Sequence, residues 1–134
     1  MTASILVVED NAVNMELTEF LLNASGYVPL LALSGAEGVR LATEEHPDLI
    51  LMDIQMPGMD GYEATEAIRR DPELQACPIV AVTAFAMVGD KDRILSQGFA
   101  GYISKPIEAE TFVAQVEAYL PPDLRGGGAQ VNIT

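Results

Sequence analysis

Short apolar runs alternate with segments of helical periodicity along this chain. Continuous β-rich runs predict strands that are covered on both faces, because such strands carry apolar side chains at nearly every position. We expect five of them, at residues 4–8, 28–33, 48–53, 79–83 and 101–104. Pro29 removes a backbone donor from the second run, which places that strand near an edge of the sheet.

The segments between these runs predict helices, because their apolar residues return every three or four positions. In the first segment Gly26 ends the helix, and the repeating apolar residues are Val13, Leu17, Phe20, Leu21 and Ala24. Ser34 and Glu37 form a capping-box pattern at the start of the second helix, which ends near Glu45. The remaining helices are expected at residues 62–70, 87–97 and 108–120.

Strand–helix alternation repeated five times predicts an α/β fold, with a parallel sheet and helices on both faces. We expect one domain over residues 1–120. The composition changes after Leu120, with Pro121-Pro122 and then three glycines at 126–128. Residues 121–134 are therefore expected to be a flexible tail or the beginning of a linker.

Charge and composition exclude several classes of partner. The formal net charge is −13, which disfavours direct binding to nucleic acids or anionic membranes and suits divalent cations and basic protein surfaces. No apolar run approaches the ~20 residues of a membrane span, and the N-terminus lacks a secretion-signal pattern. Cys77 is the only cysteine, which fits a reducing compartment, so we expect a cytoplasmic location.

Polar side chains gather where the predicted strands end. Ligands of parallel α/β sheets bind outside the carboxyl ends of the strands, and the residues there are Glu9, Asp10, Asp53, Thr83 and Lys105. Three neighbouring carboxylates favour a hard cation such as Mg²⁺. One carboxylate could act as a nucleophile towards a phosphoryl group, while the lysine, the hydroxyl and the nearby backbone N–H groups bind its oxygens.

These motifs match a known family in order and spacing. The chain resembles the receiver domain of two-component response regulators over residues 3–120, and most closely the DivK-type single-domain receivers. Receivers fused to hybrid histidine kinases remain an alternative. The matching segments are Ile5-Leu6-Val7-Val8-Glu9-Asp10-Asn11, Asp48-Leu49-Ile50-Leu51-Met52-Asp53, Gln55-Met56-Pro57-Gly58-Met59-Asp60-Gly61, Val82-Thr83-Ala84 and Lys105-Pro106.

The resemblance implies a doubly wound, flavodoxin-like fold with strand order 2-1-3-4-5, and it assigns the site. Asp53 would be the phosphoacceptor, and Thr83 and Lys105 would hold the phosphoryl group together with the backbone of Ile54 and Ala84. Tyr102 would be the aromatic switch, and the bond between Lys105 and Pro106 would be cis. The implied ligands of Mg²⁺, for which Mn²⁺ could substitute, are Asp10, Asp53, the backbone carbonyl of Gln55, and Glu9 directly or through water.

The implied function is a phosphorylation-dependent switch and not a turnover enzyme. Its phosphoryl donor would be a histidine kinase or histidine phosphotransfer protein, and its output would reach a downstream protein through the face of the fourth helix, fifth strand and fifth helix. A haloacid-dehalogenase-type phosphatase resembles D-x-D at its nucleophile, whereas this chain has Gln55 at the second position. A phosphorylation-independent binding module would lose acidic-pocket residues that are retained here.

The donor protein must approach Asp53 from the open end of the sheet. We expect its docking rim at the start of the first helix and in the loop after Lys105. Met15 lies off the expected apolar stripe and is therefore expected to be exposed. The rim residues are Asn11, Ala12, Asn14, Met15, Pro106 and Ile107.

Overall fold

Five parallel strands form the centre of the molecule in a computed structural model that describes residues 2–84 and 88–125. Their order is β2-β1-β3-β4-β5, as the family resemblance implies, and Pro29 does lie on an edge strand. The strands are β1 (Ser4–Val8), β2 (Val28–Ala32), β3 (Leu49–Asp53), β4 (Ile79–Thr83) and β5 (Gly101–Ser104).

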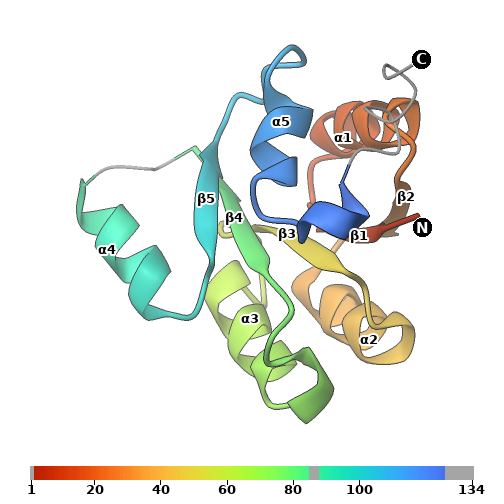
Figure 1. Ribbon diagram of the computed structural model, residues 1–134. Helices are drawn as coiled ribbons and strands as arrows, with labels where there is room; N and C mark the ends of the chain where they lie inside the picture. Colours follow the sequence, from red (N-terminus) through yellow and green to blue (C-terminus); the bar gives the residue numbers. More distant parts are fainter. Residues whose placement is uncertain (1, 85–87, 126–134) are drawn as a thin grey trace.

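Helices cover both faces of the sheet (Figure 1), with α1 and α5 on one side and α2, α3 and α4 on the other. Short 3₁₀ turns lie at Pro72–Leu74 and Pro122–Leu124. The helices are α1 (Ala12–Ala24), α2 (Gly35–Glu45), α3 (Gly61–Arg69), α4 (Val88–Ser96) and α5 (Phe112–Glu117). The doubly wound α/β fold expected from the sequence is therefore confirmed.

Side-chain caps decide where several helices begin. Ser34 accepts a hydrogen bond from the Glu37 N–H at 3.1 Å, but the Glu37 carboxylate bonds to the Leu33 N–H and so does not complete a capping box with Ser34. A complete capping box occurs at α3, between Asp60 and Glu63. Helix α5 is shorter than the expected 108–120, and the expected start of α4 at Met87 lies outside the described residues.

The register of α1 corrects the sequence prediction. Met15, Thr18 and Leu22 are its buried residues, whereas Val13 and Phe20, which were expected in the core, are 72% and 66% exposed. Thr18 can occupy a core position because its hydroxyl donates to the Asn14 carbonyl at 2.8 Å within the same helix. The helix therefore buries a face containing a threonine and exposes the more apolar stripe.

Both faces of the sheet are packed. The cluster under α1 and α5 includes Leu22, Phe112, Val116 and Leu120. None of the described helices is long and apolar enough to cross a membrane.

Candidate functional site

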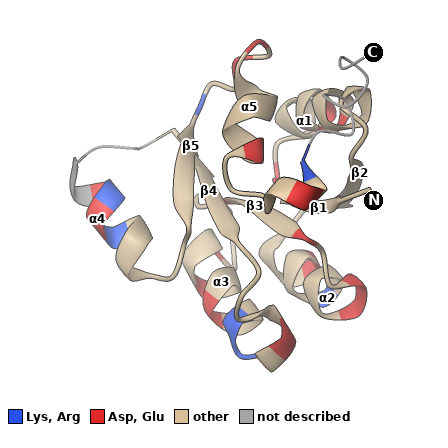
Figure 2. Cartoon of the chain, in the orientation of Figure 1, with Lys and Arg blue, Asp and Glu red and all other residues tan. Residues whose placement is uncertain are grey.

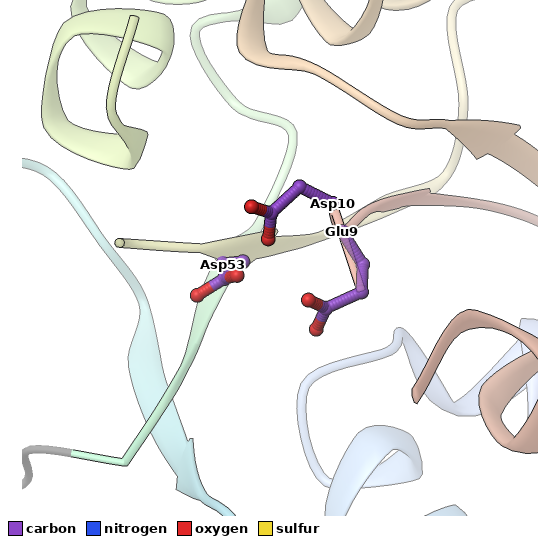
Figure 3. Close-up of side chains that lie close together, drawn as sticks. All are labelled: Glu9, Asp10 and Asp53. Carbon is purple, nitrogen blue, oxygen red and sulfur yellow. The ribbon is translucent and has the colours of Figure 1, made fainter. Parts of the chain in front are cut away.

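Three carboxylates meet at the carboxyl end of the sheet. Glu9 and Asp10 follow β1, and Asp53 ends the neighbouring strand β3, where Val8 pairs with Met52. One oxygen from each carboxylate lies within 4.8 Å of the others, and Figure 3 shows the three groups side by side. Glu9 and Asp53 are buried and Asp10 is exposed. The predicted acidic cluster thus exists and has one face open to solvent.

Lys105 brings the positive charge of the site. Its Nζ lies 2.9 Å from Glu9 Oε1 and 3.4 Å from Asp53 Oδ2, so the lysine bridges the two buried carboxylates. Burial by itself would lower the pKa of Lys105, but its hydrogen bond to Glu9 and the charges of Asp53 and Glu9 outweigh this and raise it. The lysine therefore stays protonated and available to bind an anion.

The carboxyl group of Asp53 is held in an unfavourable environment for a negative charge. Burial is the largest cause, the nearby charge of Glu9 adds to it, and Lys105 only partly opposes it, so the pKa of Asp53 is raised to about 7. The Gln55 N–H donates to Asp53 Oδ1 at 3.2 Å, and the Asn11 N–H donates to Glu9 Oε2 at 3.1 Å. A cation at this site would relieve the repulsion between the carboxylates.

This pKa predicts how the metal-free protein responds to pH. Because the pKa of Asp53 in the folded state lies above the ordinary aspartate value of 3.8, the folded state binds the proton more tightly than the unfolded state does. The stabilisation is fully present below about pH 4 and is lost as the pH rises through about 7. We expect the melting temperature of wild type, measured in chelator, to fall relative to Asp53→Asn between pH 5 and 8. A constant difference between the two proteins would contradict this.

The other two predicted positions flank the carboxylates on β4 and β5. Thr83 ends β4 and is buried, and its carbonyl accepts from the Lys105 N–H at 2.8 Å, which ties the lysine to this strand. Tyr102 on β5 is half-buried, and the Nζ of Lys91 on α4 lies 5.4 Å from the centre of its ring. This cation–π contact could not be predicted from the sequence, because nothing in the local pattern pairs α4 with β5.

The segment after Asp53 forms one wall of a cavity. This cavity has a volume of about 480 Å³, and Arg93 of α4 packs over the ring of Tyr62 at 4.0 Å to form part of its rim. An adjoining cavity of about 110 Å³ reaches Thr83. The first cavity is lined by Ile54, Gln55, Met56, Pro57, Asp60, Tyr62 and Arg93.

The docking rim is only partly as expected. Asn11, Ala12 and Pro106 are exposed, while Asn14 and Ile107 are half-buried. Met15 is 5% exposed, so the expectation that it is exposed is wrong. It packs into the core cluster between the sheet and α1, because the rotation of α1 places it on the inner face. The bond between Lys105 and Pro106 is cis, as the resemblance implied.

Acidic residues are spread over the helices and loops (Figure 2), whereas the basic residues are few and include one pair at the end of α3 and one on α4. Among the described residues, Arg40 and Arg70 form ion pairs with glutamates of their own helices, and Arg69 donates to backbone carbonyls. Lys105 is therefore the basic residue that the structure brings into the acidic cluster.

Comparison with known proteins gives the family. The response regulator receiver domain matches residues 5–117. The chain belongs to this family. Receiver domains are signalling proteins that interact with histidine kinases and downstream targets, and they typically bind Mg²⁺.

Individual receiver proteins are similar over almost the whole chain. The polar-differentiation response regulator DivK of Brucella ovis is 50% identical over 120 residues, which is 90% of this chain and 98% of that protein. Chemotaxis protein CheY4 of Vibrio cholerae has a TM-score of 0.86 with 27% identity, covering 90% of this chain and 100% of that structure.

A receiver domain that belongs to a sensor histidine kinase is also similar. The receiver domain of a sensor histidine kinase from Pseudomonas aeruginosa has a TM-score of 0.81 with 36% identity, covering 89% of this chain and 98% of that structure. It is described with a magnesium ion coordinated in its active-site cleft.

The residues present in this chain fit such an ion. Glu9, Asp10 and Asp53 supply oxygen ligands within one small volume, and Asp10 keeps an exposed side for the water ligands that Mg²⁺ retains. The donor set contains no sulfur or imidazole that would favour a softer metal.

Proposed function

We propose that this receiver accepts a phosphoryl group on Asp53 from a phosphohistidine of a histidine kinase or histidine phosphotransfer protein, with Mg²⁺ bound. The observation that carries the proposal is the position of Asp53, which lies buried beside Glu9 and Asp10 with the Lys105 ammonium 3.4 Å from its carboxylate. We assign this function to residues 1–120 and treat residues 121–134 as a tail or linker.

In the transfer step an Asp53 carboxylate oxygen attacks the phosphorus atom. The bond between phosphorus and the histidine nitrogen breaks, and its electron pair stays on the imidazole, which is protonated as it leaves. Attack of water on phosphorus later returns Asp53 to a free carboxylate and releases inorganic phosphate. The protein assists these steps mainly by positioning and charge neutralisation.

Each site residue has a role in this step. Lys105 and the Thr83 hydroxyl would bind the phosphoryl oxygens, assisted by the N–H groups of Ile54 and Ala84. Asp10, Asp53 and the Gln55 carbonyl would hold Mg²⁺, with Glu9 binding directly or through water. When bound, the cation offsets the repulsion between the carboxylates and the incoming phosphoryl group, and Mn²⁺ could substitute.

The output would pass through Thr83 and Tyr102. If Thr83 turns towards the phosphoryl group, the Tyr102 ring can follow into the vacated space and leave the Lys91 ammonium that lies over it. This changes the face formed by α4, β5 and α5, and a phosphate-biased two-state equilibrium suffices. The downstream target is a protein, because the net charge of −13 disfavours direct nucleic-acid or membrane binding. Cys77, the only cysteine, fits a cytoplasmic location.

The donor protein would dock on α1 beside the site. Val13, Leu17 and Phe20 lie at helical spacing on the outer side of α1, and Val13 and Phe20 are largely exposed. This apolar stripe begins at Val13, directly after Asn11 and Ala12, which follow Glu9 and Asp10 of the acidic cluster along the chain. Such a surface suits the side of a partner helix. The proposed docking surface therefore includes this stripe and no longer includes Met15, which is buried. The other residues of the docking rim remain part of it: Asn11, Ala12, Asn14, Pro106 and Ile107.

Metal-dependent labelling tests the proposed function. Incubation with a small phosphodonor and Mg²⁺ should add one phosphoryl group per chain, as measured by intact mass, and chelator should prevent it. Mg²⁺ should also raise the melting temperature by relieving the carboxylate repulsion. The Asp10→Asn variant should show a weaker Mg²⁺ response in both measurements. A Mg²⁺ effect identical in wild type and Asp10→Asn would contradict the metal assignment, and no labelling of wild type would contradict the function.

A further inference from the structure

Helix α3 begins directly against the backbone of Asp53. Gly61 is the first residue of this helix and is buried, and its N–H donates to the Ile54 carbonyl at 2.9 Å. A Cβ atom at Gly61 would lie 2.4 Å from the Asp53 carbonyl oxygen and 2.7 Å from the Ile54 Cα. Both are backbone atoms, so neither can turn away as the end of a side chain could.

The reason for glycine at this position is space and not backbone conformation. Gly58, in the same loop, has a φ of +77° and nothing within 4 Å of where a Cβ would be, so its conformation requires glycine. Gly61 is not among the residues with positive φ. Any side chain at Gly61 would instead force the end of β3 and the start of α3 apart.

The first turn of α3 is itself held in place. The Asp60 carboxylate accepts from the Glu63 N–H at 2.9 Å, and the Glu63 carboxylate accepts from the Asp60 N–H at 3.0 Å. This capping box makes the first turn of α3 rigid, and the hydrogen bond from the Gly61 N–H to the Ile54 carbonyl ties that turn to the end of β3. A displacement at Gly61 is therefore passed on to the backbone of Asp53 and Ile54.

We infer that Gly61 is a positioning residue for phosphoryl transfer at Asp53, an inference that rests on the proposed function. Close contact with α3 sets the backbone from which the Asp53 carboxylate and the Ile54 and Gln55 N–H groups project. Those groups act at hydrogen-bond distances, with the Gln55 N–H 3.2 Å and Lys105 Nζ 3.4 Å from the carboxylate oxygens. Misplacement of a reacting group by about 1 Å can lower a rate ~100-fold.

Gly61→Ala tests the inference. With saturating Mg²⁺ and a small phosphodonor, we expect the maximal labelling rate per folded protein to fall ~100-fold, with a nearly unchanged half-saturating donor concentration. Helix propensity cannot cause the loss, because alanine favours helix more than glycine does. Labelling of Gly61→Ala at the wild-type rate would overturn the inference.

Gly35→Ala is a matched control. Gly35 is the first residue of α2, is also buried, and its Cβ would lie 2.6 Å from a backbone carbonyl oxygen, that of Met59. We expect a lowered melting temperature for both variants, but a labelling rate within ~3-fold of wild type for Gly35→Ala alone. Gly35→Ala crowds the loop before α3 at Met59, whereas Gly61→Ala crowds the backbone of Asp53 and Ile54 directly. Equal slowing of the two variants would mean that any crowding of this loop slows labelling, and would also overturn the inference.

A second measurement does not depend on phosphoryl transfer. The carboxyl-carbon NMR signal of Asp53 in the metal-free protein should move in Gly61→Ala and stay in place in Gly35→Ala. If wild type were not labelled, the proposed function would fail while this signal still decided whether Gly61 positions Asp53. If Gly61→Ala did not fold, Asp60→Ala, which removes the capping box, should move the same signal, and an unmoved signal would overturn the inference.

Discussion

Asp53→Asn should abolish phosphorylation by any donor while leaving the protein folded. The amide occupies the same volume as the carboxylate but is a poor nucleophile, so no acyl phosphate can form. Its uncharged side chain also relieves the repulsion with Glu9, and the metal-free variant should melt no lower than wild type at pH 8. Intact mass after incubation with a phosphodonor and Mg²⁺ measures the first effect, and thermal unfolding measures the second.

The matched control for Asp53→Asn is Asp48→Asn, a substitution of the residue directly before β3. Asp48 lies at the opposite end of β3, where its carboxylate accepts from the Ser4 N–H at 2.8 Å, far from the acidic cluster. It should be labelled at the wild-type rate, although the amide oxygen accepts this hydrogen bond less strongly than the charged carboxylate does and so lowers the stability. Undiminished labelling of Asp53→Asn would show that another residue is the phosphoacceptor.

Phe20→Lys should slow transfer from a histidine donor protein at least tenfold, equivalent to ~1.4 kcal/mol of activation free energy. Phe20 is 66% exposed and lies on the apolar stripe of α1, so a lysine there costs little folding stability but puts a charge into the proposed docking surface. A small phosphodonor needs only the acidic pocket, so its labelling rate should barely change. The two rates are measured by quenching the reaction with each donor at successive times and determining the phosphorylated fraction of the protein.

Val28→Lys controls for a general effect of replacing an exposed apolar residue. Val28 is 46% exposed and lies at the beginning of β2, at the end of the sheet opposite to Asp53. It should leave both donor rates unchanged. If Phe20→Lys slowed both donors equally, the substitution would have damaged the pocket, and α1 would lose its assignment as the docking surface.

The sequence alone predicts which side chains meet at the candidate site. The continuous apolar runs identify the strands, because a strand buried on both faces must be apolar throughout, and the ends of parallel strands share one edge. The residues that follow those runs could therefore be grouped without coordinates, and Glu9, Asp53 and Lys105 do meet there. Pro29 likewise marked its strand as an edge through its missing N–H donor alone.

Which side of α1 is buried depends on how the helix packs against the sheet, and the sequence did not predict it. Apolar residues lie on more than one side of this helix, and the longest repeat at helical spacing runs through Val13, Leu17 and Phe20. Periodicity alone therefore predicted that this side is buried. Packing buries Met15 and Leu22 instead, because the helix backbone satisfies the hydroxyl of Thr18 between them. The closeness of Gly61 to the Asp53 carbonyl is likewise a property of how α3 sits on β3. Such contacts join residues by packing distance, which no spacing along one chain encodes.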